Sequence, residues 1–455
     1  MTRFVRLTAL LLALLMLACV LSSCDWIDRI KLHLSSSRET TRGIPEDDDK
    51  EYIDLSKAAF TYSPYYTPIR SRHSYQLLSD GQKALYDELY HHVREVYPET
   101  DDGEKLYKTK QVIIDEHLLS SADIRVTAKA LYDDNPELFW LSGTIYQLTD
   151  EEAGYTAVQM RSVFSPDDIT SMQNTLTAEV NRFYADVPEG MNAYQCEKYV
   201  HDFICKKCDY DSEAAELHDT ADRDANAYII YGVMAENNAV CEGYARTMQL
   251  LLTGLGVDCV GIMGDGIDTS TGDTELHMWN AVELDGDWYY VDATWDDQLY
   301  TYRRYQYFNM DEKTMSKDHT LSPLMSELTE DQINGEETKS SVSMNIFLPE
   351  CTATRYQYFI FECPHLESFD DGGDVKDSLY RAALDREEYL TVYIDPKHLD
   401  YDDAIDQLFK EEPQYFFSYV HDVNGWLSEY EIDNSNLTYF NNEERSVVTV
   451  MLSYY

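Results

Sequence analysis

Cys241 has the residue type and the local setting of a nucleophile. It lies in "NNAVCEGYARTMQLL", where Asn237–Asn238 indicates a turn and the apolar spacing from Cys241 onward predicts a helix ending at Gly254 or Gly256. At a helix N-terminus the unpaired backbone N–H groups and the positive end of the helix dipole favour the thiolate form of a cysteine. The same N–H groups can stabilise the oxyanion formed during acyl transfer. Cysteines at helix starts are also commonly structural, so a nucleophile here needs a proton acceptor.

His277 and Asp292 are the candidates for that acceptor and for an acid that orients it. The segment "LHMWNAVELDGDWYYVDATW" has two alternating apolar runs around Asp285–Gly286, which predicts a hairpin with a type I′ turn. Counting outward from this turn places Asp292 opposite Trp279, with His277 two residues away on the same face. A register shift of one residue would put Asp292 on the other face. The pattern predicts an imidazole that takes the thiol proton and a carboxylate that fixes its tautomer and stabilises the imidazolium.

Other catalytic motifs are missing from the sequence. It has no G-x-S-x-G, H-E-x-x-H, Walker or dinucleotide-binding pattern, which disfavours serine hydrolases, zinc proteases, NTPases and dehydrogenases. The loop "DGIDTSTGDTE" does not match the spacing of a calcium-binding loop. We therefore assign no metal and no cofactor to this chain.

Three blocks of sequence resemble the core of the bacterial transglutaminase-like superfamily, which has a papain-like catalytic fold. They are "AVCEGYA", "HMWNAVELDGDWYYVDATW" and "YFNMDEKTMSKDHT", and they agree with the family in order and spacing over roughly residues 195–325. The resemblance implies that Cys241 is the nucleophile, His277 the general base and Asp292 the orienting acid.

Other conspicuous residues of this region receive less active roles. By the same resemblance, Trp279 and Trp295 are expected to form walls of the cleft, and His319 in "KDHT" is expected to be structural. Cys205 and Cys208 have the spacing of a metal or redox pair, but no second pair at ligand spacing follows them. Chance placement at the end of an amphipathic helix, or a local disulfide, is the simpler interpretation of that pair.

The family resemblance leaves three functions open. Members of the family cross-link glutamine to lysine, hydrolyse peptides or amides, or act as scaffolds without chemistry. The first hypothesis is a surface-anchored thiol acyltransferase or peptidase that acts on protein or cell-wall peptides. The second is a catalytically idle adhesion or assembly lipoprotein whose flanking repeat binds a partner. The third is a wall-peptide amidase, and Asp292 argues against it because related wall enzymes often have a second histidine in its place.

The elements around these residues predict an α+β protein. We expect a papain-like transglutaminase core, in which the helix bearing the cysteine packs on an antiparallel sheet bearing the histidine and the aspartate, flanked by two copies of a small α+β module. Residues 111–143 and 390–420 are the proposed copies, because each indicates strand, helix and aromatic strand before a β-rich stretch. Coincidence between two such units is the alternative. The predicted domains are a signal peptide (1–23), a flexible tether (24–72), an N-terminal module (73–170), a catalytic domain (171–330) and a C-terminal module (331–455).

The N-terminus predicts export and a lipid anchor. "MTRFVR" followed by an apolar run is typical of a signal peptide, and the run is too short to span a membrane stably. It ends in "LSSC", which resembles the lipobox of bacterial lipoproteins, so Cys24 is expected to carry lipid and to hold the protein at the extracytoplasmic face of the bacterial cell membrane. An ordinary signal peptide or an uncleaved anchor is the alternative.

Composition limits the partners. The chain has 36 basic and 84 acidic residues and a net charge of −48, a field that disfavours nucleic acid and docking of the folded body on anionic lipid. The apolar content of 44% is ample for a folded core. Of nine cysteines, seven remain beyond Cys24. This odd number leaves at least one thiol free in an exported protein. Composition does not specify an oligomeric state.

Overall fold

The computed structural model describes residues 72–455, with gaps at 102–103, 153, 218–224, 270, 299–303, 322–324, 334–335, 344, 370–371, 429 and 436. The predicted signal peptide, Cys24 and nearly all of the predicted tether lie outside the described residues. In the described part, every helix is too short or too polar to cross a bilayer. The fold is α+β with antiparallel sheets, as predicted, and the chain divides into two compact units.

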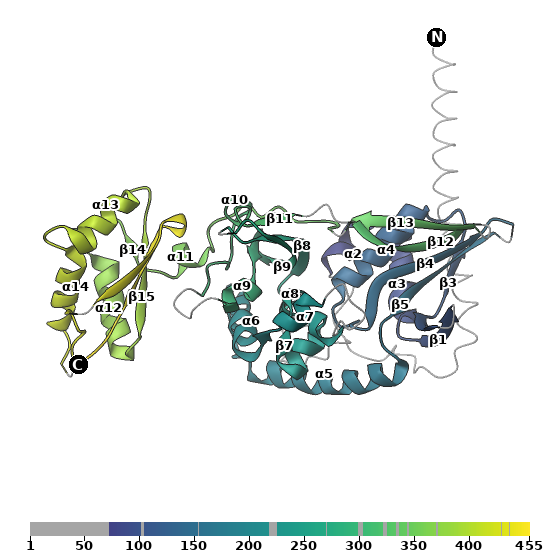
Figure 1. Ribbon diagram of the computed structural model, residues 1–455, viewed down its shortest axis with the longest axis horizontal. Helices are drawn as coiled ribbons and strands as arrows, with labels where there is room; N and C mark the ends of the chain where they lie inside the picture. The colour runs from purple at the N-terminus through teal and green to yellow at the C-terminus, as the bar shows by residue number, and fades with distance from the viewer. Residues whose placement is uncertain are drawn as a thin grey trace, which may run out of the picture. The chain divides into compact units, whose positions relative to one another are not determined.

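The first unit consists of the chain up to Asp186 together with residues 323–347, which come later in the sequence. Its strands form a sheet of order β1-β2-β5-β4-β12-β13, in which β3 also pairs with β5 (Figure 1). The first long helix begins with a capping box formed by Ser79 and Gln82. The elements are α2 (His73–Leu77), α3 (Asp80–His92), β1 (Val96–Asp101), β2 (Glu104–Thr109), β3 (Val112–Asp115), α4 (Ser121–Asp134), β4 (Leu141–Asp150), β5 (Tyr155–Ser162), α5 (Pro166–Asp186), β12 (Met325–Ile333) and β13 (Glu336–Ser343).

The division of the chain differs from the domain boundaries expected from the sequence. The expected boundary at residue 170 falls inside α5, and the compact units separate after Asp186. Strand β12 pairs in parallel with β4, so residues 323–347 belong to the first unit. The stretch "MSELTEDQI" is too polar to indicate a strand. Its place in the sheet is therefore set by pairing with a strand far away in sequence.

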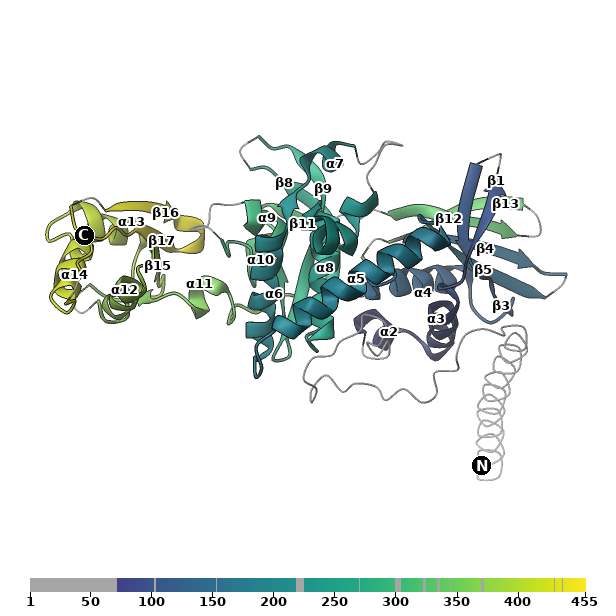
Figure 2. The same cartoon turned by 90° about the horizontal axis from the view of Figure 1, so that it is seen from below.

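The second unit contains the three candidate catalytic residues. Helix α8 contacts strands β8 and β9 of an antiparallel sheet of order β10-β9-β8-β11, as Figure 2 shows from below. The Asn280 side chain donates to the Ala245 carbonyl at 2.9 Å and fixes the helix on the sheet. The elements are α6 (Ala193–Lys207), β6 (Asp209–Tyr210), α7 (Ser212–Glu216), η3 (Ala225–Tyr228), η4 (Gly232–Glu236), β7 (Asn238–Ala239), α8 (Cys241–Gly254), β8 (Cys259–Ile267), β9 (Thr274–Leu284), β10 (Asp287–Val291), α9 (Ala293–Gln298), α10 (Glu312–Met315) and β11 (His319–Leu321).

The predicted hairpin and its register are confirmed. Asp285 and Gly286 both have positive φ, 55° and 91°, as a type I′ turn requires. Leu284 pairs with Asp287, and the ladder continues without a shift to the end of β10. Asp292 follows directly after that strand, on the side that the count from the turn predicted.

The C-terminal part of the second unit has the strand order β14-β15-β17-β16. In the proposed repeat the strand orders correspond, because β3-β5-β4 in the first copy matches β15-β17-β16 in the second. The elements are α11 (Tyr358–Phe361), β14 (His365–Leu366), α12 (Gly373–Asp385), β15 (Tyr389–Ile394), α13 (Tyr401–Ile405), η6 (Asp406–Lys410), α14 (Tyr415–Asn424), β16 (Thr438–Asn442), η7 (Glu443–Arg445) and β17 (Val447–Met451).

The predicted aromatic strand of this second copy is wrong, because residues 415–424 form helix α14. Phe416, Tyr419, Val420 and Val423 are buried, which is helical spacing. A short apolar run after a proline fits a buried strand and a buried helix equally well from the sequence.

A buried charged cluster joins helices α6 and α9 of the second unit. His201 is fully buried, with Nδ1 3.2 Å from Asp202 Oδ1 and Nε2 3.1 Å from Asp296 Oδ2. Burial by itself would lower the pKa of His201, but its neighbours, including Cys205 and both carboxylates, raise it well above its ordinary value. The imidazolium therefore compensates the buried carboxylate of Asp296.

We predict that His201→Gln lowers the free energy of unfolding of this unit by about 3 kcal/mol, since it leaves a buried carboxylate without its cation. Urea unfolding of the full chain, followed by circular dichroism, measures the change. The exposed histidine His398 supplies the control, because His398→Gln should change stability by less than about 0.5 kcal/mol. The raised pKa of His201 means that its contribution is complete below the ordinary histidine pKa and is lost as the pH rises through the folded value. Equal effects of both variants would contradict the role of the cluster.

Candidate active site

Cys241 is the first residue of α8, as predicted. The residue before it, Val240, has extended backbone, and its side chain does not cap the helix. The first backbone N–H groups of α8 are therefore available to another acceptor. A Cβ on Gly243 would lie 2.5 Å from the Ala227 carbonyl oxygen, so this glycine lets the first turn pack closely against the preceding loop. All seven described cysteines are free thiols, and Cys241 is one of two that are partly exposed.

His277 and Asp292 form a buried hydrogen-bonded pair. His277 Nε2 lies 2.7 Å from Asp292 Oδ2, and the two residues are only 2% and 1% exposed. Because a carboxylate oxygen accepts, Nε2 carries a proton and Nδ1 is the nitrogen left for the hydrogen bond with Cys241. The second oxygen of Asp292 accepts the N–H groups of Thr294 and Trp295 at 2.9 and 3.2 Å. The three predicted catalytic residues are thus brought together by α8, β9 and the end of β10.

The electrostatics of this pair favour a protonated imidazole on His277. Burial by itself would lower the pKa of His277, but the charge and hydrogen bond of Asp292, with a further contribution from Cys241, raise it to about 10. Burial would raise the pKa of Asp292, yet His277 and His319 hold it well below its usual range. The imidazolium is therefore the stable form of His277 at neutral pH.

The two tryptophans have different positions. Trp279 is 2% exposed and stacks on His277 with ring centroids 6.0 Å apart, so it supports the imidazole from inside the core. Trp295 is partly exposed and lies 5.4 Å from the same ring. Strand β8 makes room for both, because a Cβ on Gly264 would be 2.4 Å from Trp279 and one on Gly266 would be 2.8 Å from Trp295.

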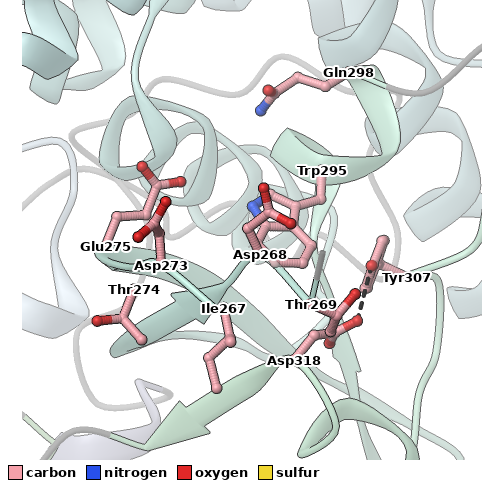
Figure 3. Close-up of a pocket in the computed structure, with 10 residues that line it drawn as sticks. All are labelled: Ile267, Asp268, Thr269, Asp273, Thr274, Glu275, Trp295, Gln298, Tyr307 and Asp318. Atoms are coloured by element: carbon pink, nitrogen blue, oxygen red, sulfur yellow. Dashed lines mark hydrogen bonds between the residues drawn. The ribbon is translucent and has the colours of Figure 1, made fainter. Parts of the chain in front are cut away.

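A pocket of about 540 Å³ opens beside the catalytic pair (Figure 3). Trp295 lines it, and Glu275 reaches it from β9, two residues from His277 and on the same face of the strand. Figure 3 shows Asp273 and Glu275 on one side and the hydrogen bond from Tyr307 to Asp318 on the other. The lining residues are Ile267, Asp268, Thr269, Asp273, Thr274, Glu275, Trp295, Gln298, Tyr307 and Asp318. Four carboxyl side chains and two aromatic rings give this pocket an affinity for cationic groups.

Two side chains of the site were not assigned to it from the sequence. His319, expected to be structural, has Nε2 3.1 Å from Asp292 Oδ2 and therefore contacts the catalytic acid directly. Tyr210 is close enough to Cys241 and Glu275 to interact with them electrostatically, since burial and then these two residues raise the pKa of its hydroxyl. The tripeptide "CDY" offered no sequence signal for Tyr210, whereas a histidine just after an aspartate in "KDHT" was visible but had no predicted position.

Two groups of side chains have the spacing of metal ligands. They are His277, Asp292 and His319 at the catalytic pair, and His365, Glu367 and Asp395 in the C-terminal part, each with ligand atoms within 4.8 Å of one another. In the first group a single oxygen of Asp292 accepts from both imidazoles, so N–H protons occupy the positions where an ion would bind. Hydrogen bonding accounts for the arrangement of this group.

Comparison with known proteins places the site in a recognised domain. Residues 184–293 match the family model of the transglutaminase-like superfamily. A stretch of 144 residues is 28% identical to kyphoscoliosis peptidase of Mus musculus, and 143 residues are 27% identical to that of Homo sapiens. Each match covers 30% of this chain and 21% of the relative, so the chain spans a small part of the length of these relatives. A solved structure described as "Crystal structure of a TGase" is 15% identical, with a TM-score of 0.23, over 31% of this chain and 41% of that chain.

We predict that iodoacetamide at mildly acidic pH alkylates Cys241 at least roughly tenfold faster than the other described cysteines. Burial raises the pKa of Cys196, Cys205, Cys208, Cys259, Cys351 and Cys363, so these thiols are protonated and slow. The faster alkylation of Cys241 should persist up to about pH 10, where His277 loses its proton. Peptide mapping by mass spectrometry measures each site, and His277→Ala should abolish the selectivity. Equally slow labelling of all these cysteines would indicate that Cys241 is structural.

Proposed function

We propose that this chain, whose residues 184–293 form a transglutaminase-like domain, is a thiol-dependent enzyme that transfers acyl groups from amide or peptide bonds. The observation that carries the proposal is the alignment of a partly exposed cysteine at a helix start with a buried imidazole–carboxylate pair. The peptidase names of the curated relatives support the same reaction class.

The proposed reaction follows from these groups. The Cys241 thiolate attacks the carbonyl carbon of the substrate, and the resulting oxyanion lies at the N-terminal N–H groups of α8. His277 gives its Nδ1 proton to the leaving nitrogen, the C–N bond breaks and an amine departs, leaving a thioester on Cys241. His277 then removes a proton from water, which attacks the thioester and releases a carboxylic acid. A primary amine in place of water would give a new amide, which is a cross-link.

We further propose that the protein acts outside the cytoplasm, anchored through lipid at Cys24, on protein or cell-wall peptides. The sequence pattern before Cys24 supports this location. The strongly acidic body favours basic partners at the cell surface over nucleic acid.

The second candidate function is a catalytically idle scaffold that binds a partner through the flanking modules. The matching strand orders of the two modules favour it, because duplicated modules are common in binding proteins. The scaffold needs no reactive thiol, so the two functions differ in what they require of Cys241.

We predict that Cys241→Ala lowers turnover of a fluorogenic peptide or amide library by at least about 1,000-fold while the far-ultraviolet circular dichroism spectrum stays unchanged. Cys363→Ala removes the other partly exposed thiol and should leave turnover unaltered. Mass spectrometry with and without an added primary amine distinguishes hydrolysis from transamidation. A folded wild-type chain that forms no thioester with any amide substrate would favour the scaffold.

The pocket beside His277 predicts a preference for substrates with a basic side chain near the reacting carbonyl. Glu275→Gln should raise KM for a lysine-containing peptide about three- to fivefold, a modest effect because this carboxylate is exposed to solvent. KM for the matched glutamine-containing peptide should change little. Asp287→Asn, which removes an exposed charge outside the pocket, is the control. An equal loss for both peptides would show that Glu275 does not select charge.

A further inference from the structure

His319 contacts two carboxyl groups, and the proposed reaction assigns it no role. It is 3% exposed, and each ring nitrogen faces a carboxyl oxygen, with Nε2 3.1 Å from Asp292 Oδ2 and Nδ1 2.7 Å from Asp318 Oδ1. An ionised carboxylate only accepts hydrogen bonds, so each ring nitrogen of His319 is placed to donate to a carboxyl oxygen. A buried imidazole between two carboxyl groups thus lies directly on Asp292.

The sheet is built so that this ring reaches Asp292. His319 on β11 pairs with Gly266 on β8, and His277 on β9 pairs with Gly264, so β8 separates the two histidines. Strands two apart lie roughly 9–10 Å from each other, yet the imidazole centroids are 5.4 Å apart. The two glycines have no side chain between the rings, which lets both rings lean over β8 and meet.

The aromatic neighbours of His319 hold it in this position. Trp295 lies 4.3 Å from the His319 ring, Trp279 5.0 Å and Tyr307 5.4 Å, measured between centroids. Tyr307 also donates to Asp318 Oδ2 at 2.9 Å, so the carboxylate behind His319 is fixed as well. The ring is therefore confined on both faces and at both nitrogens.

Asp292 Oδ2 receives hydrogen bonds from two imidazoles. The bond from His277 is 2.7 Å and the bond from His319 is 3.1 Å, so one carboxylate charge is shared unequally between two rings. A general acid must give its proton to the leaving nitrogen, which requires that its carboxylate partner does not hold the protonated ring too strongly. A second N–H donor on the same oxygen weakens that hold.

We propose that His319 is a positioning residue of the reaction, sharing the Asp292 carboxylate with His277 and thereby limiting how tightly Asp292 retains the His277 proton. This inference rests on the proposed function for its effect on turnover. Its effect on the His277 proton is measurable without any substrate.

The charged and titratable groups around the two rings are few. Asp292, Cys241 and His319 face His277, and Asp292, Asp318, His277 and Tyr307 face His319. The Arg445 guanidinium lies 5.6 Å over the Tyr307 ring. The two histidines are the side-chain donors to Asp292 among the described hydrogen bonds.

The test is the titration of His277 in the full chain, followed by NMR with isotope-labelled histidine, in the wild type and in His319→Gln. Loss of the second donor to Asp292 leaves this carboxylate to His277 alone and should move the His277 ionisation upward by roughly one pH unit. Turnover of an amide substrate should fall roughly ten- to hundredfold because the ring is less well oriented and its proton is held more tightly. Asp292→Asn is the comparison, since it should move the same ionisation downward.

The direction of the shift decides the outcome. A merely structural His319 would loosen the His277–Asp292 pair on removal, so the ionisation would move downward or stay unchanged, and the proposal would be overturned. If His319→Gln does not fold, Asp318→Asn keeps the ring while removing its second carboxylate, and it should give a smaller upward shift. His398→Gln is the control for labelling and fold. An upward shift in a chain without amide turnover would support the role of His319 and reject the proposed function.

Discussion

The carboxylate of Asp292 is the interaction on which the site depends. It is 1% exposed and accepts four hydrogen bonds, two from backbone N–H groups at the start of α9 and two from imidazoles. A buried charge of this kind is costly unless every lone pair is used. Asp292 therefore fixes more than the tautomer of His277, because it also determines where α9 begins and where β11 can lie. Displacing it would release the helix that carries Trp295 and the strand that carries His319.

A second constraint is that two positions of β8 must be glycine, although these residues take no part in the proposed chemistry. Gly264 and Gly266 leave the face of the strand bare between two histidines and under two tryptophans. Side chains from the neighbouring strands β9 and β11 therefore meet over this bare face of β8. The acidic rim of the pocket beside this face of the strand comes largely from the ends of β8 and β9, so the strand that carries His277 also supplies part of the rim.

The parts of the fold that could be predicted from the sequence are those set by local chemistry. The turn at Asp285–Gly286 determines the hairpin register, and the register places His277 and Asp292 on one face. The position of His319 could not be predicted, because a strand of three residues has no periodicity and its partner β8 is distant in sequence. The same holds for the polar hairpin of β12 and β13, and for α14, where a short aromatic run was compatible with either a strand or a helix.

The domain contains a second cysteine–histidine–aspartate group, and comparing the two groups shows how the candidate site differs from a buried one. Cys205 Sγ lies 3.9 Å from His201 Nε2, and that nitrogen is 3.1 Å from Asp296. The residue types match those of the candidate site, although His201 contacts two carboxylates and His277 contacts one. However, Cys205 is in the last turn of α6, where the helix dipole opposes a negative charge, and burial raises the pKa of its thiol. Cys241 differs by lying at the start of its helix and by reaching solvent, so the helix end and the exposure, more than the three residue types, distinguish the candidate site from the buried group.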